Sequence, residues 1–141
     1  MKKLFPLLLP LMFLFGCTGT STQTPITIKT VNNGKALQVT GFDPAIINDI
    51  GRDSSAKAWE TLMAVYRMPA DTSLKNLQPV QPGRYVIKDN VIIFTPDTAF
   101  NTQQTYFFRY YNFEAGSTLT DLIRSHSKPG TLHYTDLIFK Q

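Results

Sequence analysis

Apolar and polar residues alternate along much of the chain after residue 25, which is the pattern of half-buried β-strands. The first two such segments, 26–31 and 36–40, are joined by Asn-Asn-Gly-Lys, a sequence typical of tight hairpins. Further segments of strand length lie at 84–88, 91–95, 105–113, 118–123 and 132–139. Seven or eight short strands separated by turn residues predict an all-β domain, folded as a single antiparallel sandwich.

Segment 41–55 interrupts the alternation and is predicted to be a long connection that contains a short helix. Asp43 and Pro44 are residue types that start helices, and Gly51 is placed to end this one. A second helical turn is predicted after Asp71, whose side chain can cap it.

Segment 58–66 fits two patterns. Trp59, Leu62 and Met63 recur at helical spacing, whereas Trp59, Thr61 and Met63 also alternate as on one face of a strand. We interpret the segment as a strand that Pro69 stops.

Segment 105–113 is the most aromatic part of the chain. Successive side chains of a strand point to opposite faces of the sheet. One face then carries Tyr106, Phe108 and Tyr110, and the other carries Phe107, Arg109, Tyr111 and Phe113. The second face is either covered, with the 41–55 connection as the expected cover, or exposed to a sugar or a protein. Covering is the favoured interpretation, and exposure would give a ligand-binding set of Trp59, Arg109, Tyr111 and Phe113.

A different pattern opens the chain. Lys2 and Lys3 precede an apolar run of twelve residues at 4–15, and Gly16 and Cys17 follow it. This order of charged, apolar and small residues is typical of a secretory signal. A membrane-spanning helix needs roughly 20 apolar residues, so the run is predicted to direct export.

The residues Leu14-Phe15-Gly16-Cys17 resemble the lipobox of bacterial lipoproteins. The resemblance implies that the signal peptide, residues 1–16, is removed and that Cys17 becomes an N-terminus modified by lipid, with acyl chains such as palmitate. The alternative is an ordinary signal peptide in which the Cys stands by chance. Cys17 is the only cysteine of the sequence, so no second thiol is present for a disulfide or for thiol catalysis.

Residues 17–25 carry no charge and no large apolar side chain, which predicts a flexible tether between the lipid and a domain at 26–141. In the lipoprotein family, an Asp directly after the Cys favours retention at the inner membrane. This chain has Thr18 there. The resemblance therefore implies a cell envelope location at the outer membrane, with the domain facing the periplasm.

A second resemblance rests on a series of short motifs between residues 61 and 111. They are Met68-Pro69-Ala70-Asp71-Thr72-Ser73-Leu74, Gly83-Arg84-Tyr85, Ile93-Phe94-Thr95-Pro96-Asp97, and Phe100 followed six residues later by Tyr106. This series resembles the bacterial Ig-like domains of the surface-layer-protein type, and implies an Ig-like β-sandwich. Tyr106 is then expected to form a tyrosine corner, with its hydroxyl bonded to loop backbone and Phe100 beneath it.

Charge and composition exclude several classes of function. Without Lys2 and Lys3, the 14 basic residues become 12, against 10 acidic residues, and the basic residues are scattered. Nucleic acid is therefore not an expected partner. His126 and His133, even with Asp121 or Asp136, supply too few ligands for a structural zinc site, so no metal or other cofactor is expected.

The sequence also predicts that the protein is not an enzyme, because it contains no Gly-x-Ser-x-Gly motif and no glycine-rich phosphate loop. We therefore expect a membrane-anchored lipoprotein that acts as a non-catalytic interaction or accessory module, in contact with an envelope protein. The alternative function is binding of a glycan or small ligand by the aromatic set defined above.

Overall fold

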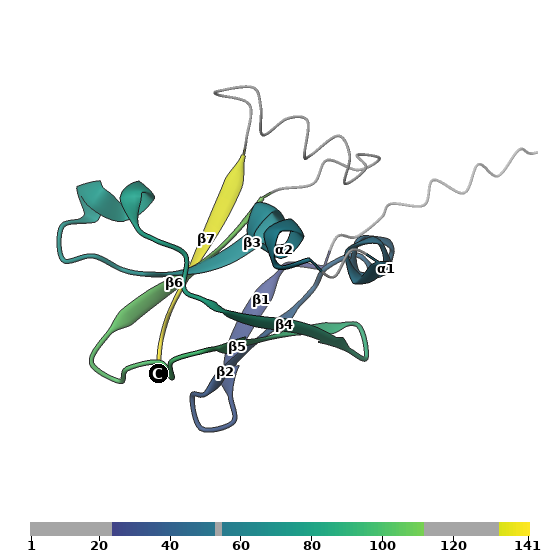
Figure 1. Cartoon of the computed structure of the whole chain (residues 1–141), viewed down its shortest axis with the longest axis horizontal. Coiled ribbons are helices and arrows are strands. Elements are labelled where there is room, and N and C mark those ends of the chain that lie inside the picture. The colour runs from purple at the N-terminus through teal and green to yellow at the C-terminus, as the bar shows by residue number, and fades with distance from the viewer. Residues whose placement is uncertain (1–23, 53–54, 112–132) are drawn as a thin grey trace, which may run out of the picture.

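The computed structural model describes residues 24–52, 55–111 and 133–141. Within these ranges the chain forms two antiparallel sheets that pack face to face, with short helices at the ends (Figure 1). The predicted all-β sandwich is confirmed at this level. The predictions for the signal peptide, Cys17, Phe113, the strand at 118–123 and His126 lie outside the described residues.

The four-stranded sheet contains the two predicted hairpins. Its strand order is β1 (Thr27–Val31), β2 (Ala36–Thr40), β5 (Val91–Pro96) and β4 (Gly83–Lys88). Asn32 and Asn33, and likewise Asp89 and Asn90, have φ between 52° and 60°. Asn and Asp tolerate this left-handed conformation better than most residues. The two turns are therefore set by local sequence.

The three-stranded sheet has the order β3 (Met63–Arg67), β6 (Thr105–Tyr111) and β7 (Tyr134–Lys140). Phe107 of β6 pairs with Tyr66 of β3 on one side and with Ile138 of β7 on the other. The strand predicted at 132–139 is thus present, and begins at Tyr134.

Helix α1 (Pro44–Arg52) confirms the helix predicted in the 41–55 connection, and the Asp43 carboxylate accepts a hydrogen bond from the backbone N–H of Ala45 at 2.7 Å. The 3-10 helix η1 (Thr72–Leu77) is capped by Asp71, as predicted.

The strand predicted over 58–66 is wrong in its first half. Residues 56–62 form helix α2 (Ala56–Leu62), and β3 begins only at Met63. The Ser55 hydroxyl caps the helix by accepting from the N–H of Ala58. Helical spacing then turns Trp59 and Leu62, exposed by 5% and 2%, into the core. Both periodic patterns were present because the segment changes from helix to strand.

The core lies between the sheets and is rich in aromatic rings. Its largest fully buried side chains include Phe94, Phe108 and Leu37. The Tyr106 hydroxyl accepts a hydrogen bond from the backbone N–H of Asn101 at 3.0 Å, and the Phe100 ring packs on Tyr106 with centroids 4.8 Å apart. The expected tyrosine corner is confirmed.

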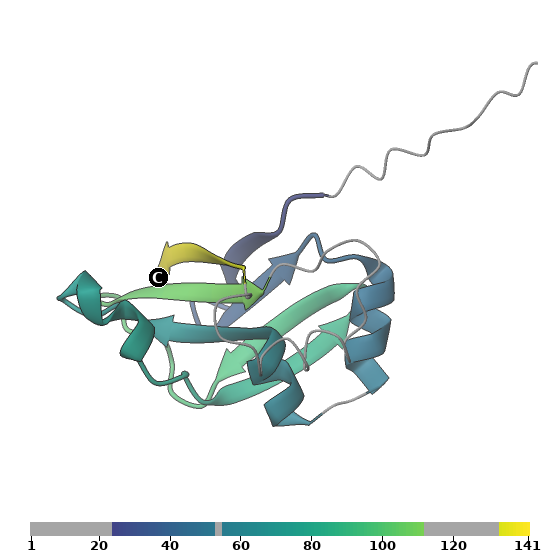
Figure 2. The ribbon, with the colours of Figure 1, turned by 90° about the horizontal axis from the view of Figure 1, so that it is seen from above.

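The helices lie at opposite ends of the sandwich. Figure 2 shows α1 and α2 at one end, and η1 near the other end, where the C-terminus also lies. In α1, Ile47 and Ile50 are buried in the core. Strand β1 starts opposite Thr40, the last residue of β2, so the chain enters the domain at the α1 end.

Candidate functional site

The outer face of the three-stranded sheet points away from the core. It contains an arginine whose guanidinium donates three hydrogen bonds. Arg109 of β6 is 7% exposed. Its Nε and Nη2 donate to the two carboxylate oxygens of Asp136 on β7, at 2.7 and 2.8 Å, and Nη2 also donates to the Asn76 side-chain oxygen at 2.9 Å. The bidentate geometry fixes the guanidinium in one plane. That plane lies over the Tyr134 ring, 3.8 Å from the ring centroid.

Asp136 joins this face to η1. The Nζ of Lys75 lies 2.7 Å from its carboxylate and 4.7 Å from the centroid of the Phe107 ring. Phe107 is fully buried and stacks on Tyr66, with centroids 5.0 Å apart. Helix η1 therefore covers part of the outer face through polar and cation–π contacts.

The pKa shifts agree with an ionised network. Burial raises the pKa of Asp136, but the hydrogen bonds from Arg109 and Lys75 outweigh it and leave the pKa below its ordinary value. The hydrogen bond to Asp136 raises the pKa of Arg109, against the effect of burial. Burial raises the pKa of Tyr66, with Tyr111 as a second cause. Both partners of the ion pair thus keep their charge at neutral pH.

The outer face was predicted to be covered by the 41–55 connection, and this prediction is only partly right. Phe107 and Arg109 are covered, as favoured, but by η1 and β7 and not by the 41–55 connection. That connection packs on the core side instead, where the Phe42 ring meets Tyr110 edge-on at 5.9 Å. The reason is that Phe42, like the isoleucines of α1, closes the open end between the sheets.

The three described residues of the predicted ligand-binding set, Trp59, Arg109 and Tyr111, do not share one surface. Trp59 is buried on α2 and stacks on Tyr85 of the other sheet, with centroids 5.1 Å apart. Arg109 is buried in the network described above, and Tyr111 is half-buried with its ring edge-on to Tyr134 at 6.2 Å.

Exposed apolar side chains occur on the two elements, η1 and β7, that supply partners to the buried network. Five large ones are exposed in the described residues, and four of them are on η1 and β7: Leu74, Leu77, Tyr134 and Ile138. We call these four residues the η1–β7 patch. The fifth, Val86, lies on β4 of the other sheet. Sequence reasoning missed the patch because apolar residues in short turns and on strands are usually assigned to the core.

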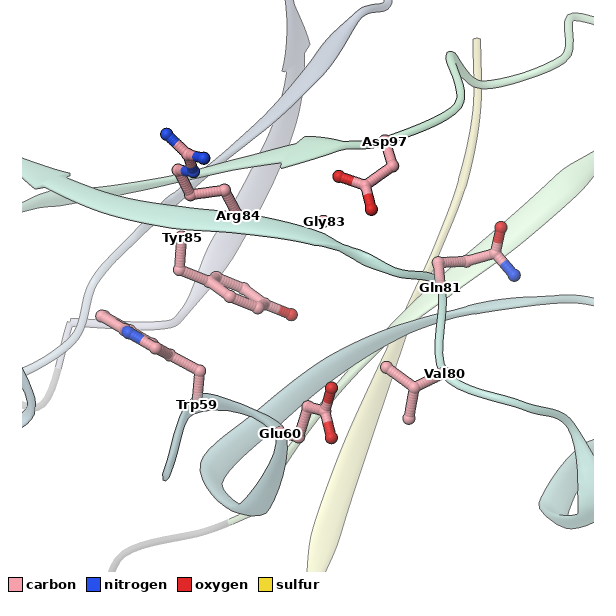
Figure 3. A pocket seen from close by; sticks show the side chains of 8 residues that line it. All are labelled: Trp59, Glu60, Val80, Gln81, Gly83, Arg84, Tyr85 and Asp97. Carbon is pink, nitrogen blue, oxygen red and sulfur yellow. The ribbon is translucent and has the colours of Figure 1, made fainter. Parts of the chain in front are cut away.

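A cavity of about 300 Å³ lies on the opposite edge of the sandwich, between α2 and the start of β4 (Figure 3). It is lined by Trp59, Glu60, Val80, Gln81, Gly83, Arg84, Tyr85 and Asp97. The Tyr85 hydroxyl donates a long hydrogen bond, 3.4 Å, to the carbonyl of Met63.

Across 24–52, 55–111 and 133–141, three or more His, Cys, Asp or Glu residues nowhere gather as metal ligands would. None of the helices within this part of the chain has both the length and the apolar character that crossing a bilayer requires. Comparison with protein-family models, curated proteins and solved structures finds no match to this sequence.

Proposed function

We propose that this protein is a lipid-anchored lipoprotein of the cell envelope whose β-sandwich is a non-catalytic module that contacts another envelope protein. The η1–β7 patch is the observation that carries the protein-contact part of the proposal. The lipobox resemblance at Cys17 supports the anchoring part.

The orientation of η1 supports a role in contact. A 3-10 helix has three residues per turn, so Leu74 and Leu77 lie on one face of η1. Lys75 and Asn76, which bind Asp136 and Arg109, hold the helix on the sheet. Leu77 is 77% exposed. The helix thus presents its leucines to solvent and its polar residues to the protein, and covering the leucines with a partner would remove apolar surface from water.

The point at which the chain enters the domain also favours this surface. Extended backbone advances about 3.3–3.6 Å per residue, so the chain from Cys17 to Thr24 spans at most about 25 Å. A lipid on Cys17 therefore keeps the α1 end of the domain near the membrane. Helix η1, at the other end, then points toward proteins beyond the bilayer surface (Figure 2).

We also propose that the sandwich is Ig-like, of the constant-domain type. In that type the first, second, fifth and fourth strands form one sheet and the third, sixth and seventh form the other, which is the order of β1 to β7 here. The hydrogen bond of Tyr106 supports the same assignment. Phe108, two residues later, stands where antibody domains have the second cysteine of their disulfide.

Site-specific photo-crosslinking in intact cells tests the contact. A photoreactive amino acid replaces Leu77, Ile138 or, as the matched control, Val86, which is also exposed but lies on the other sheet. We expect the same protein adduct from Leu77 and Ile138, identified by mass spectrometry, and none from Val86. An equal adduct from Val86, or no adduct from any position, contradicts the contact surface.

Fractionation tests the anchor separately. Cys17→Ser removes the acceptor of the lipid, so the variant should be lost from the membrane fraction or accumulate at its unprocessed size. Normal membrane anchoring of this variant would refute lipidation at Cys17 and leave the crosslinking result standing.

A further inference from the structure

The outer face of the four-stranded sheet carries a line of exposed side chains along its edge strand β4. Tyr85 and Ile87 of this strand pack on the core. Because successive side chains of a strand alternate between the two faces, Arg84, Val86 and Lys88 lie on the outer face, and all three are exposed. An exposed apolar residue thus stands between two cations at this edge of the sheet.

Lys29 adds a third cation at the opposite edge of this face. Directly paired residues of antiparallel strands point to the same face, and one row of pairs crosses the whole sheet: Lys29, Gln38, Ile93 and Val86. Neighbouring strands lie about 4.8 Å apart, so Lys29 is roughly 14 Å from β4, and Arg84 and Lys88 are about 13 Å apart along that strand. The three cations therefore surround an apolar centre, which Val86 and the half-buried Ile93 provide.

No acidic residue of the four strands points to this face. Its outward positions are 27, 29 and 31 on β1, 36, 38 and 40 on β2, 91, 93 and 95 on β5, and 84, 86 and 88 on β4, and none is Asp or Glu. The acids nearest along the chain, Asp89 and Asp97, lie beyond the strand ends, in a turn and a bend. Neither Lys29, Arg84 nor Lys88 forms an ion pair with a residue that the structure describes. A flat anionic surface complements this charge.

The predicted tether joins the domain at an edge of this same sheet. Strand β1 is an edge strand that begins at Thr27. A lipid on Cys17 keeps Thr24 within about 25 Å of the bilayer, which is close enough for the sheet to lie against it. The two sheets pack face to face, so the η1–β7 patch then points away from the membrane, toward a protein partner (Figure 1).

We propose that this surface, the basic face (Lys29, Arg84, Val86 and Lys88), docks on anionic phospholipid headgroups of the membrane to which the chain is anchored. Docking of this face rests on the proposed function, because it requires the lipid anchor. Each Lys or Arg near an anionic bilayer contributes about fivefold to binding, so three contribute roughly a hundredfold. That factor is small for a free protein. The anchor already holds the domain at the surface, so the cations decide which face it turns to the membrane.

Fluorescent labels on single cysteines measure the orientation. Cys17 is the only cysteine and its sulfur carries the lipid, so Val86→Cys and Ile138→Cys each supply one free thiol. Both positions are exposed, and they lie on opposite sheets. The lipidated variants are reconstituted in vesicles of phosphatidylcholine mixed with phosphatidylglycerol, with and without a lipid that bears a quencher on its headgroup. We expect stronger quenching at position 86 than at 138, and equal quenching at both in pure phosphatidylcholine.

Charge variants of the labelled protein locate the contact. Arg84→Gln with Lys88→Gln should lower the ratio of quenched to unquenched label at position 86 by roughly twenty-fivefold, about fivefold for each cation. Arg67→Gln with Lys140→Gln removes the same charge from the three-stranded sheet and should leave the ratio unchanged. All four side chains are exposed, so the domain should stay folded, which the emission of the buried Trp59 checks. Salt at 1 M, where the Debye length is about 3 Å, should act as the first pair does.

Flotation of the vesicles separates the possible failures. Protein that does not float with them refutes the lipid anchor, and docking of the basic face with it. Protein that floats but is quenched equally at 86 and 138 in the anionic vesicles, or as strongly at 86 after Arg84→Gln with Lys88→Gln, overturns the docking alone and leaves the anchor and the η1–β7 contact standing. A protein adduct at Val86 in the crosslinking experiment would assign the basic face to a protein and also overturn its docking on lipid.

Discussion

The hydroxyl of Tyr106 offers a clean test of how the loop after β5 is held to the sandwich. The Tyr106 ring is 3% exposed and packs against Phe100 and Phe139, with centroids 4.8 and 5.7 Å away. Its oxygen accepts the backbone N–H of Asn101 at 3.0 Å. Tyr106→Phe keeps the ring and removes only this acceptor.

The expected loss in the free energy of unfolding follows from the one hydrogen bond that Tyr106→Phe removes. A hydrogen bond contributes a net 0.5–1.5 kcal/mol, about 1 kcal/mol on average, and an N–H left without a partner adds up to about 1 kcal/mol more where water cannot reach it. Asn101 is at an exposed position in the loop, so water can replace part of the interaction. We therefore expect a free energy of unfolding lower by about 1 kcal/mol, and a Tm lower by about 4 °C.

Urea and thermal unfolding of the two proteins measure this difference. Tyr110→Phe is the matched control, because Tyr110 lies on the same face of the same strand and its hydroxyl has no hydrogen-bond partner in the described residues. We expect its stability to change by less than about 0.5 kcal/mol. Equal unfolding midpoints for Tyr106→Phe and the parent protein would show that the tyrosine corner contributes nothing to stability.

Two further predictions concern the outer-face network and the core. Asp136→Asn should cost about 2 kcal/mol, the range for hydrogen bonds to charged groups. Because the native pKa of Asp136 is lowered, this stabilisation is complete above the unfolded pKa of about 3.9 and is lost as the pH falls through the native pKa. The exposed pair of Asp49 and Arg52, at 3.6 Å, gives a control: Asp49→Asn should cost under about 0.5 kcal/mol at every pH, and an equal cost for both variants would contradict the network. Gly83→Ala should destabilise by about 1–3 kcal/mol by overpacking, because a Cβ there would come within 2.6 Å of the Phe94 ring. At Gly51 in α1 a Cβ would meet only the Ile87 Cδ1, at 3.3 Å, and this end of a flexible side chain can shift, so Gly51→Ala should stabilise by up to about 1 kcal/mol. Chemical denaturation measures both, and a stabilising Gly83→Ala would refute the packing argument.

The parts of the fold that the sequence predicted are those set by neighbouring residues. The hairpin at Asn32 and Asn33 and the caps by Asp43 and Asp71 each depend on side chains within a few positions, and all were identified. The first half of the strand predicted at 58–66 was misassigned, because the chain is helical up to Leu62 and the strand begins only at Met63. The helical part is stabilised by the burial of Trp59, which only the tertiary structure shows.

The candidate site was harder to predict, because it depends on long-range pairs. Arg109 and Asp136 are 27 positions apart and meet only through the register of β6 and β7. Asn76 reaches the same guanidinium from η1, which is 33 positions away. The sequence indicated Arg109 as a ligand-binding residue, but it could not show that a carboxylate already occupies its donors.

Helix η1 turns its polar side chains toward the protein and its leucines toward solvent, and the sheet beneath it explains why. Residue type alone predicts that Leu74 and Leu77 turn inward and Lys75 outward. Here the outer sheet face offers the Asp136 carboxylate and the Phe107 ring, and both attract an ammonium group more strongly than a leucine. Lys75 therefore turns toward the sheet, and the leucines, three positions apart in a 3-10 helix, are left in water. In the isolated domain this arrangement pairs the charges and leaves the leucines exposed. A partner that covers the leucines would remove their apolar surface from water and so stabilise the complex. The η1–β7 patch favours a contact function for this reason.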